Sequence, residues 1–169
     1  MKIGFIGTGQ ITKAVVIGII SSKLKINKIY ISERNKKISK NLKSKSKKII
    51  IIKNNQEIIN KSNWVFLAVT PKVGRKILSN YTYKSNQIIV SFISTIKMKQ
   101  LKKMIKVKAK IVRAIPLPPI SLGKGPVPIY PPDKQVKVFF DKIGTTVEIR
   151  SEKSSKNFWA TSGMMAPFY

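Results

Sequence analysis

Two glycines near the start of the chain, Gly7 and Gly9, have the spacing of a turn that binds a dinucleotide. They directly follow a short apolar run and precede residues that recur at helical spacing. A diphosphate must approach the backbone closely and face the N–H groups of a helix N-terminus, and residues without a Cβ permit this. We expect Gly7 to form the tight turn and Gly9 to leave room for a pyrophosphate. The predicted cofactor contacts in this turn are Gly7, Thr8, Gly9, Gln10 and Ile11.

The residues around the turn support this interpretation. Lys2 to Ile6 is predicted to be a strand, and a helix is expected to follow the turn. Where a third glycine often lets helix and strand pack closely, this chain has Thr12, so we expect a slightly displaced helix with the site retained. Glu33 ends a second predicted strand 24 residues after Gly9, close to the place expected of a ribose-binding carboxylate.

The residues around Glu33 bear on which nucleotide binds. Ser32, Arg34 and Asn35 are expected where an adenosine 2′-phosphate would lie, and Arg34 offers that phosphate a planar, permanently charged fork. We therefore expect NADP. Glu33 leaves NAD open, because its carboxylate would accept ribose hydroxyls and repel a phosphate. The alternative for Arg34 is an ordinary surface residue at a helix start.

Further candidates follow the later strands, since ligands bind at the carboxyl ends of strands in such sheets. After the fourth predicted strand we expect the cleft to be lined by Ala68, Val69, Thr70 and Pro71. Plain core packing is the alternative there, above all for Val69. Lys72 is expected either to approach a phosphate or to be solvated. The candidate nicotinamide contacts are Ser94, Thr95 and Pro116.

Composition excludes several classes of site. The chain has 169 residues and 43% hydrophobic content, which suits one globular domain. It contains no Cys and no His, which excludes disulfides, the usual zinc ligand sets and nucleophilic sites built on His or Cys. No metal site is expected. We find no basic leader and no apolar run long enough to span a bilayer, so a cytoplasmic protein with no membrane partner is expected.

The net charge of +28 first suggests a nucleic-acid-binding protein. The detail points elsewhere, because only Arg34, Arg75, Arg113 and Arg150 are arginine among the 34 basic residues. The lysines of residues 36–48 have no aromatic side chains between them on which bases would stack. We expect a solvated basic surface and no nucleic-acid partner, with anionic-surface binding as the alternative.

Strands and helices alternate along the chain, which predicts an α/β fold of the Rossmann type with a doubly wound, mostly parallel sheet. The remaining predicted strands are 49–52, 64–69, 87–93, 110–115 and 146–149, and the helices are 36–42, 55–60, 73–78, 98–105 and 136–142. Residues 116–132 hold seven prolines, so no regular helix is expected there. Residues 127–130 are expected to form an edge strand, where proline is tolerated.

The last residues differ from the rest of the chain in composition. We expect a cofactor-binding domain over residues 1–152 and the start of a second, helical unit over residues 153–169. The segment from Phe158 to Tyr169 is too apolar for a solvated tail, so something should cover it.

Four segments together resemble the pyrroline-5-carboxylate reductase family over essentially the whole chain: Ile3-Gly4-Phe5-Ile6-Gly7-Thr8-Gly9, Ile31-Ser32-Glu33-Arg34-Asn35, Val65-Phe66-Leu67-Ala68-Val69-Thr70-Pro71 and Val112-Arg113-Ala114-Ile115-Pro116. The resemblance implies a cofactor, NADPH or NADH, that reduces the C=N bond of 1-pyrroline-5-carboxylate to give proline. It also implies a helical second domain that forms the dimer and most of the substrate pocket.

This chain departs from the family in one segment and resembles the opening of the family's second domain in another. Leu117-Pro118-Pro119 stands where the family usually has Asn-Thr-Pro, which leaves a different imine substrate open. Ala160-Thr161-Ser162-Gly163 resembles the opening of the second domain, so the chain is expected to be an amino-terminal fragment of a form that is a homo-oligomer.

The carboxylates constrain the chemistry. There are six, and residues 58–132 contain none, so no general acid is expected beside the cleft and no catalytic residue is assigned. Imine reduction tolerates this, because a protonated imine is already electrophilic, whereas ketone reduction usually needs a proton donor. A non-catalytic nucleotide-sensing or partner-binding module, with residues 158–169 as its docking element, remains the alternative.

Overall fold

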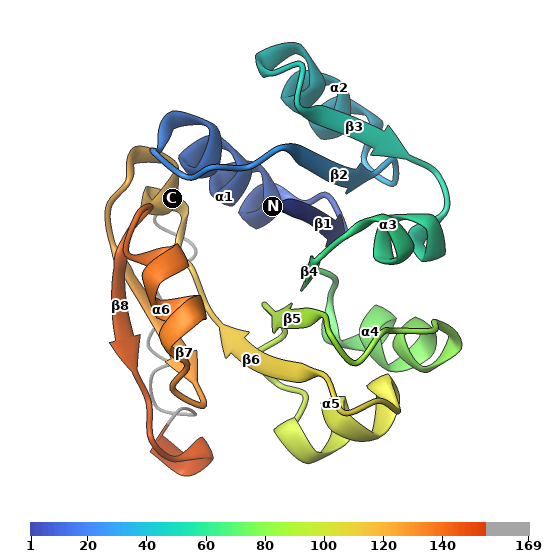
Figure 1. Cartoon of the computed structure of the whole chain (residues 1–169), viewed down its shortest axis with the longest axis vertical. Coiled ribbons are helices and arrows are strands. Elements are labelled where there is room, and N and C mark those ends of the chain that lie inside the picture. Colours follow the sequence, from blue (N-terminus) through green and yellow to red (C-terminus); the bar gives the residue numbers. More distant parts are fainter. Residues whose placement is uncertain (155–169) are drawn as a thin grey trace.

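Eight strands form a single sheet in the part of the chain that the structure, a computed structural model, describes, which is residues 1–154 (Figure 1). The order across the sheet is β3-β2-β1-β4-β5-β6-β7-β8. The strands are β1 (Lys2–Ile6), β2 (Lys28–Ser32), β3 (Ile49–Ile52), β4 (Trp64–Leu67), β5 (Ile88–Ser91), β6 (Lys110–Ala114), β7 (Pro126–Tyr130) and β8 (Thr145–Glu148).

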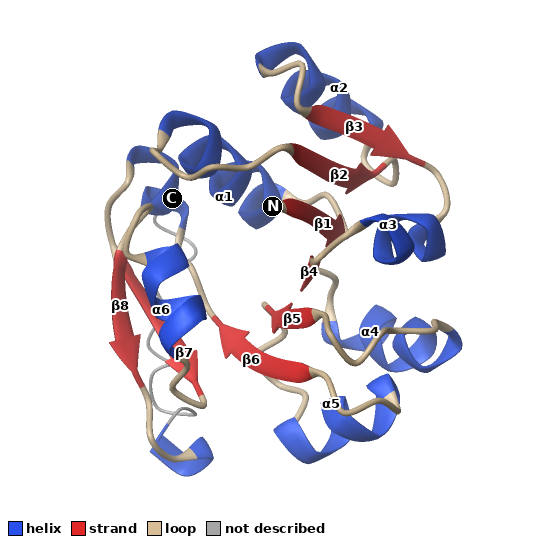
Figure 2. Cartoon of the chain, viewed as in Figure 1, coloured by secondary structure: helices blue, strands red, loops and turns tan. Residues whose placement is uncertain are grey.

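Helices connect these strands, as Figure 2 shows. They are α1 (Gln10–Ser21), α2 (Lys36–Lys45), α3 (Asn55–Lys61), α4 (Pro71–Ile77), α5 (Met98–Ile105) and α6 (Lys134–Phe140), with short 3₁₀ helices η1 (Leu78–Asn80) and η2 (Pro118–Leu122). All pairs from β3 to β6 are parallel. The chain moves outward from β1 to β3 and then returns to the other side of β1 at β4. The predicted Rossmann-type α/β fold is therefore confirmed.

The sheet separates two apolar cores. On one face α1, α2 and α6 pack over β1 and β4, where Phe5 and Phe66 stack with their ring centroids 4.6 Å apart. On the other face, α3, η1 and α5 cover side chains such as Ile6 and Leu67. Continuous apolar strands are typical of a parallel sheet covered on both faces. The two cores leave the carboxyl ends of β1, β2 and β4 at one rim of the sheet.

The prediction that residues 127–130 form an edge strand is wrong. Strand β7 lies inside the sheet, antiparallel to β6 and parallel to β8. Gly125 and Ile129 accept hydrogen bonds from the β8 side, whereas the carbonyl of Pro128 faces β6 and accepts the N–H of Ile115. The prolines are tolerated because their missing N–H groups fall on the side facing β6, where the ladder comprises only two residue pairs.

The fourth strand is also shorter than predicted. It ends at Leu67, two residues before Val69, so residues 68–70 form a turn at the rim. Pro71 then occupies the first turn of α4, a position that needs no backbone N–H. In the proline-rich segment no α-helix forms among residues 116–132, and the 3₁₀ helix η2 packs against α1 instead.

Two expectations concern the end of the chain. The segment 158–169 and the motif 160–163 lie outside the described residues. Among residues 1–154, no helix is long and apolar enough to cross a membrane.

Candidate functional site

A cleft opens at the rim of the sheet where the turn after β1 meets the ends of β2 and β4. Its volume is about 580 Å³, and a smaller cavity of about 270 Å³ adjoins it beside β3. Both share Gly7, Arg34, Lys36 and Val69. The larger cleft is lined by Gly7, Thr8, Gly9, Arg34, Asn35, Lys36, Ala68, Val69, Thr70 and Val73. This is the switch point between β1 and β4, where open α/β sheets bind ligands.

Gly7 is required by the protein's own backbone. Its φ is +102°, a conformation that L side chains rarely adopt. A Cβ there would lie 2.3 Å from the carbonyl oxygen of Ala68 and 2.9 Å from a methyl group of Val69. Only glycine lets β1 turn this closely against the end of β4.

Gly9 is different, because the protein itself does not require a glycine there. Its φ is −100°, and a Cβ built on it would meet no atom within 4 Å. It is the N-cap of α1, and within residues 1–154 no side chain caps this helix. The first turn of α1 carries no acidic residue either, so its N–H groups and positive dipole end face the cleft. The geometry leaves a place for an anion that needs close approach to the backbone.

Buried hydroxyl groups hold the turn. The N–H of Gly7 donates to Oγ of Ser32 at 3.1 Å, and the hydroxyl of Thr8 donates to the carbonyl of Ser32 at 2.6 Å. Thr12, which replaces the third glycine, is fully buried and donates to the carbonyl of Gly7 at 2.8 Å. The turn is therefore fastened to both β2 and α1. Ser32 is only 4% exposed and supports the turn, so its expected contact with a 2′-phosphate stays a prediction.

One wall of the cleft is cationic. Arg34 and Lys36 are exposed at the start of α2, and Lys53 joins them in the smaller cavity, which Glu33 also lines. Asn35 lines the larger cleft, and its side chain accepts the N–H of Ile38 and so caps α2. Three cations against one carboxylate favour a ligand with negative charge beside β2.

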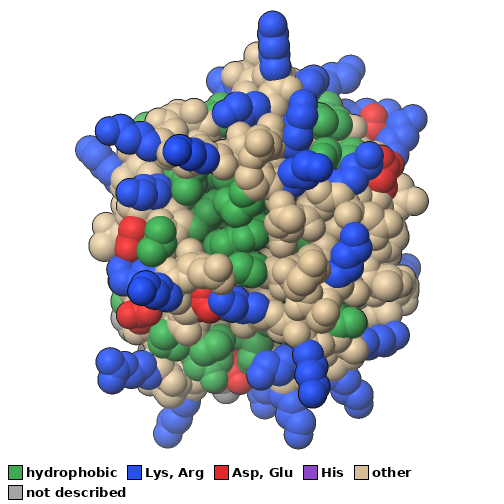
Figure 3. All heavy atoms as spheres, in the orientation of Figure 1, with side chains coloured by type: hydrophobic (Ala, Val, Ile, Leu, Met, Phe, Trp, Pro, Cys, Tyr) green, Lys and Arg blue, Asp and Glu red, His purple; other side chains and the backbone are tan. Residues whose placement is uncertain are grey.

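Sequence reasoning missed five residues that line these cavities: Lys36, Lys53, Asn55, Val73 and Ile77. Lys53 directly follows β3, the neighbour of β2, so the strand-end rule that selected Arg34 also selects Lys53, and Asn55 is the first residue of α3. The sequence does not distinguish Lys36 from the many other lysines expected at the surface. Figure 3 shows how numerous they are, since Lys and Arg project from most of the visible face and few acidic side chains lie between them.

The opposite wall is apolar and comes from the turn after β4. Ala68, Val69 and Thr70 line the cleft, and Val69 is half-buried against the core as well. Pro71 and the exposed Lys72 begin α4 and do not line it. Their predicted contacts remain predictions.

Several predicted residues lie near the rim but outside the cleft lining. Gln10 and Ile11 are the first residues of α1, and Pro116 is buried just after β6. Ser94 and Thr95 lie in the loop between β5 and α5. None of these five residues lines either cavity, so their predicted contacts remain predictions.

Titratable groups are sparse at the site. Among the carboxylates of residues 1–154, Glu33 lines the cavities, and the described part of the chain contains no cluster of His, Cys, Asp or Glu that could hold a metal ion. Asp133 and Asp141 lie at the two ends of α6, where Asp133 is the N-cap and Asp141 the C-cap. Burial works to raise the pKa of each, yet both pKa values lie below the ordinary value, because Lys110 and the N–H groups of α6 bind Asp133, and Lys137 and Thr146 bind Asp141.

The sequence of the chain is similar to those of known proteins. The model of a family described as NADP oxidoreductase, coenzyme F420-dependent, matches residues 2–95. A pyrroline-5-carboxylate reductase of Synechocystis is 25% identical over 157 residues, covering 88% of this chain and 58% of the relative. Pyrroline-5-carboxylate reductase 3 of Danio rerio is 31% identical over 129 residues, covering 74% and 44%. The resemblance to pyrroline-5-carboxylate reductases is confirmed, and the chain spans about half the length of these relatives.

Solved structures show the same fold. The 1-pyrroline-5-carboxylate reductase of Streptococcus pyogenes superposes with a TM-score of 0.83 at 23% identity, over 99% of this chain and 65% of that one. The pyrroline carboxylate reductase of Plasmodium falciparum, solved with NADP bound, gives 0.82 at 24% identity, over 100% and 64%.

Proposed function

The chain belongs to the family described as NADP oxidoreductase, coenzyme F420-dependent, and on this premise we propose that it is the cofactor-binding part of an NADP-dependent reductase of a cyclic imine. The proposed substrate is 1-pyrroline-5-carboxylate and the product is proline, as the names of its relatives suggest. The protein would act in the cytoplasm, as a homo-oligomer in a form that includes a second domain.

The observation that carries this proposal is the contrast at the first turn. Gly7 is explained by contacts within the protein, but Gly9 is not, since a Cβ there would point into open space. A glycine without an internal reason, at the uncapped start of a helix, fits a ligand that presses against the backbone. The pyrophosphate of a dinucleotide meets that description, so residues 7–11 would hold it through backbone N–H groups.

The preference for NADP over NAD rests on the cationic wall. Arg34, with Lys36 and Lys53 beside it, would bind the 2′-phosphate, and Asn35 would fix the start of α2. Glu33 opposes this preference, because its carboxylate favours unmodified ribose hydroxyls. We propose that the three cations outweigh the single carboxylate.

The residues present suit hydride transfer to an imine. A bound nicotinamide supplies the hydride, and the chain's task is to hold the ring and exclude water. The apolar wall of Ala68 and Val69 would serve that task. A protonated cyclic imine is already electrophilic, so the lack of a second carboxylate in the described cleft is compatible with the reaction.

Titration with NADPH and NADH tests the cofactor assignment. The wild-type chain is expected to bind NADPH more tightly, and Arg34→Ala should weaken NADPH binding by about tenfold while NADH binding stays unchanged. The matched control is Arg75→Ala, which removes another exposed arginine, on α4 and outside the cleft lining. If neither nucleotide binds the wild type, the proposal is wrong.

The substrate is tested separately. Consumption of NADPH is followed with 1-pyrroline-5-carboxylate and with cyclic imines of other ring sizes. Turnover of another imine but not of 1-pyrroline-5-carboxylate would replace the substrate and keep the reaction class, which the Leu117-Pro118-Pro119 segment leaves open.

A further inference from the structure

Arg113 heads the largest fully buried side chains of the described residues, and it lies outside the cleft lining. It comes from β6, where Ser91 of β5 is its register partner, and its side chain is 2% exposed. Burial lowers the pKa of its guanidinium, and the contact with Glu152 acts in the opposite direction. A buried cation of this kind is costly unless it is paired and hydrogen-bonded.

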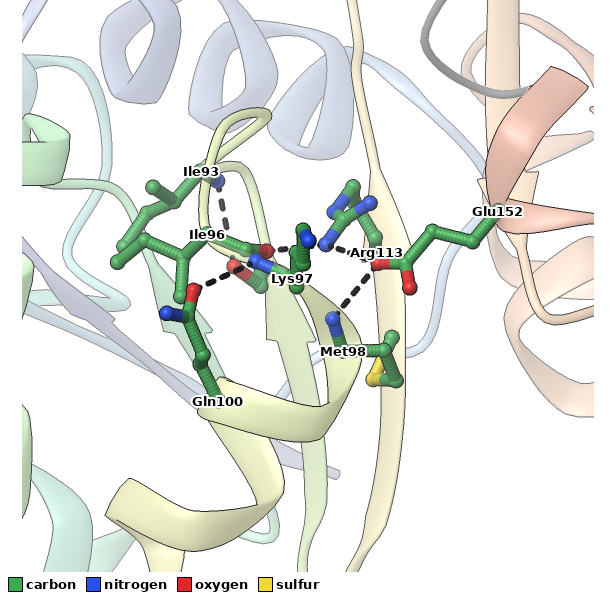
Figure 4. Close-up of polar contacts among 8 residues, drawn as sticks. Ile93, Ile96, Lys97, Met98, Gln100, Arg113 and Glu152 are labelled. Atoms are coloured by element: carbon green, nitrogen blue, oxygen red, sulfur yellow. Dashed lines mark hydrogen bonds and ion pairs between the residues drawn. The ribbon is translucent and has the colours of Figure 1, made fainter.

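Figure 4 shows what the guanidinium reaches. Its Nη2 donates to the carbonyl oxygen of Ile96 and to Oε1 of Glu152, the latter at 3.1 Å. The same Oε1 accepts the backbone N–H of Met98, the first residue of α5, at 2.7 Å. The Arg113–Glu152 clamp, meaning these two side chains, thus joins β6, the start of α5 and the segment after β8.

The clamp holds the loop between β5 and α5, residues 92–97. The carbonyl of Ile96 is bound directly, and the N–H of Met98 fixes the end of the loop. At its other end the N–H of Phe92 donates to the carbonyl of Leu67, the last residue of β4, at 2.9 Å. The loop is therefore held at both ends, and its first residue is bonded to the strand that leads into the apolar wall.

Close packing continues from this loop to the cleft. A Cβ on Gly74 of α4 would lie 2.9 Å from Cδ1 of Ile93 and 3.3 Å from Cδ1 of Ile96, so the loop presses directly on that helix. Thr70 and Val73, at the start of the same helix, line the cleft. A shift of the loop would move this wall, since packed interiors transmit displacement rather than absorb it.

We propose that the Arg113–Glu152 clamp positions the wall of the cleft that receives the nicotinamide half of the cofactor, and that it does so by docking the segment after β8 onto the start of α5. Arg113 and Glu152 are positioning residues, because neither touches the cleft. This inference rests on the proposed dinucleotide site.

Hydrogen exchange tests the clamp without any nucleotide. In Glu152→Gln the charge that pairs with Arg113 is lost, and the amide of Met98 and those of residues 92–97 should exchange about tenfold faster or more. The amides of the Gly7–Gly9 turn should be unaffected. Glu57→Gln is the matched control, because it removes the same charge from an exposed pair with Lys61 on α3. Unchanged exchange at Met98 would overturn the clamp.

Two ligands then separate positioning from general stability. Adenosine 2′,5′-bisphosphate carries the adenine half and its 2′-phosphate but no nicotinamide. Glu152→Gln should weaken NADPH binding by about tenfold and leave binding of the bisphosphate within about twofold of wild type. Gly74→Ala, which pushes the same loop without touching the clamp, should have the same selective effect.

Other results would overturn the inference. Equal losses for both ligands would mean that the clamp only stabilises the fold. Failure of the wild type to bind either ligand would instead reject the proposed function. Hydrogen exchange at Met98 would still test the contact between Met98 and Glu152.

Discussion

The first turn and the Arg113–Glu152 clamp stabilise the same rim of the sheet by opposite means. The turn uses backbone geometry and small hydroxyl groups, with Gly7, Thr8 and Ser32 within 25 residues of one another. The clamp uses a partly buried ion pair between residues 39 positions apart. Short motifs therefore encode the local geometry of the site, whereas the contacts that support it from other elements depend on how the chain folds back.

The largest effect is expected from breaking the turn. Gly7→Ala places a Cβ 2.3 Å from the carbonyl oxygen of Ala68 at a φ of +102°, so the free energy of unfolding should fall by about 3 kcal/mol or more. Gly123→Ala is the control, because its φ is also positive, at +70°, but no atom lies within 4 Å of the new Cβ. It should cost about 1 kcal/mol. Denaturant unfolding measures both, and equal losses would refute the close-approach argument.

Ser32 tests whether hydroxyl groups support the turn. Ser32→Ala removes the acceptor of the Gly7 N–H, so the free energy of unfolding should fall by about 2 kcal/mol. NADPH and NADH binding should weaken equally. The control is Ser39→Ala, a buried serine whose hydroxyl bonds only within α2, to the carbonyl of Lys36. A loss confined to NADPH would mean that Ser32 reads the 2′-phosphate instead.

Gly9 sharpens the contrast within the turn. Gly9→Ala should change the free energy of unfolding by less than about 0.5 kcal/mol, because its Cβ meets nothing. NADPH affinity should nevertheless fall by about tenfold or more, since the methyl group occupies the space proposed for the pyrophosphate. Calorimetric titration and unfolding are measured on the same sample. Normal affinity would contradict the proposed site.

The smallest effect concerns Asp133, a carboxylate outside both the turn and the clamp. Asp133 caps α6 and pairs with Lys110 of β6 at 2.8 Å, and its pKa is lowered. Its contribution is therefore present above the unfolded pKa of about 3.9 and is lost as the pH falls through the folded pKa. Asp133→Asn should cost about 1 kcal/mol at neutral pH and flatten the acid limb of the stability profile.

Unfolding between neutral pH and about pH 2 measures this limb. Glu57→Gln, which breaks an exposed pair, should leave the limb unchanged. An unaltered limb in Asp133→Asn would show that the cap and ion pair contribute nothing.

Most of the fold could be predicted from periodicity and turn residues. The bounds of β1, β2, β3 and α5 agree with expectation, because buried apolar runs and helical spacing are local signals. The interior position of β7 could not be predicted, since which side of a strand its prolines face depends on the register with β6 and β8. The end of β4 at Leu67 depends likewise on contacts made by the turn after it.

For the site, the glycine turn, the cationic end of β2 and the residues after β4 could be predicted from the sequence, because each follows from a local rule about backbone freedom or strand ends. The burial of Ser32 beneath the turn and the contact of Glu152 with the first residue of α5 could be found only in the folded chain. Those facts depend on which strands become neighbours and how the chain returns after β8. Pairing of distant residues is set by the packing of the whole sheet, and no short motif encodes it.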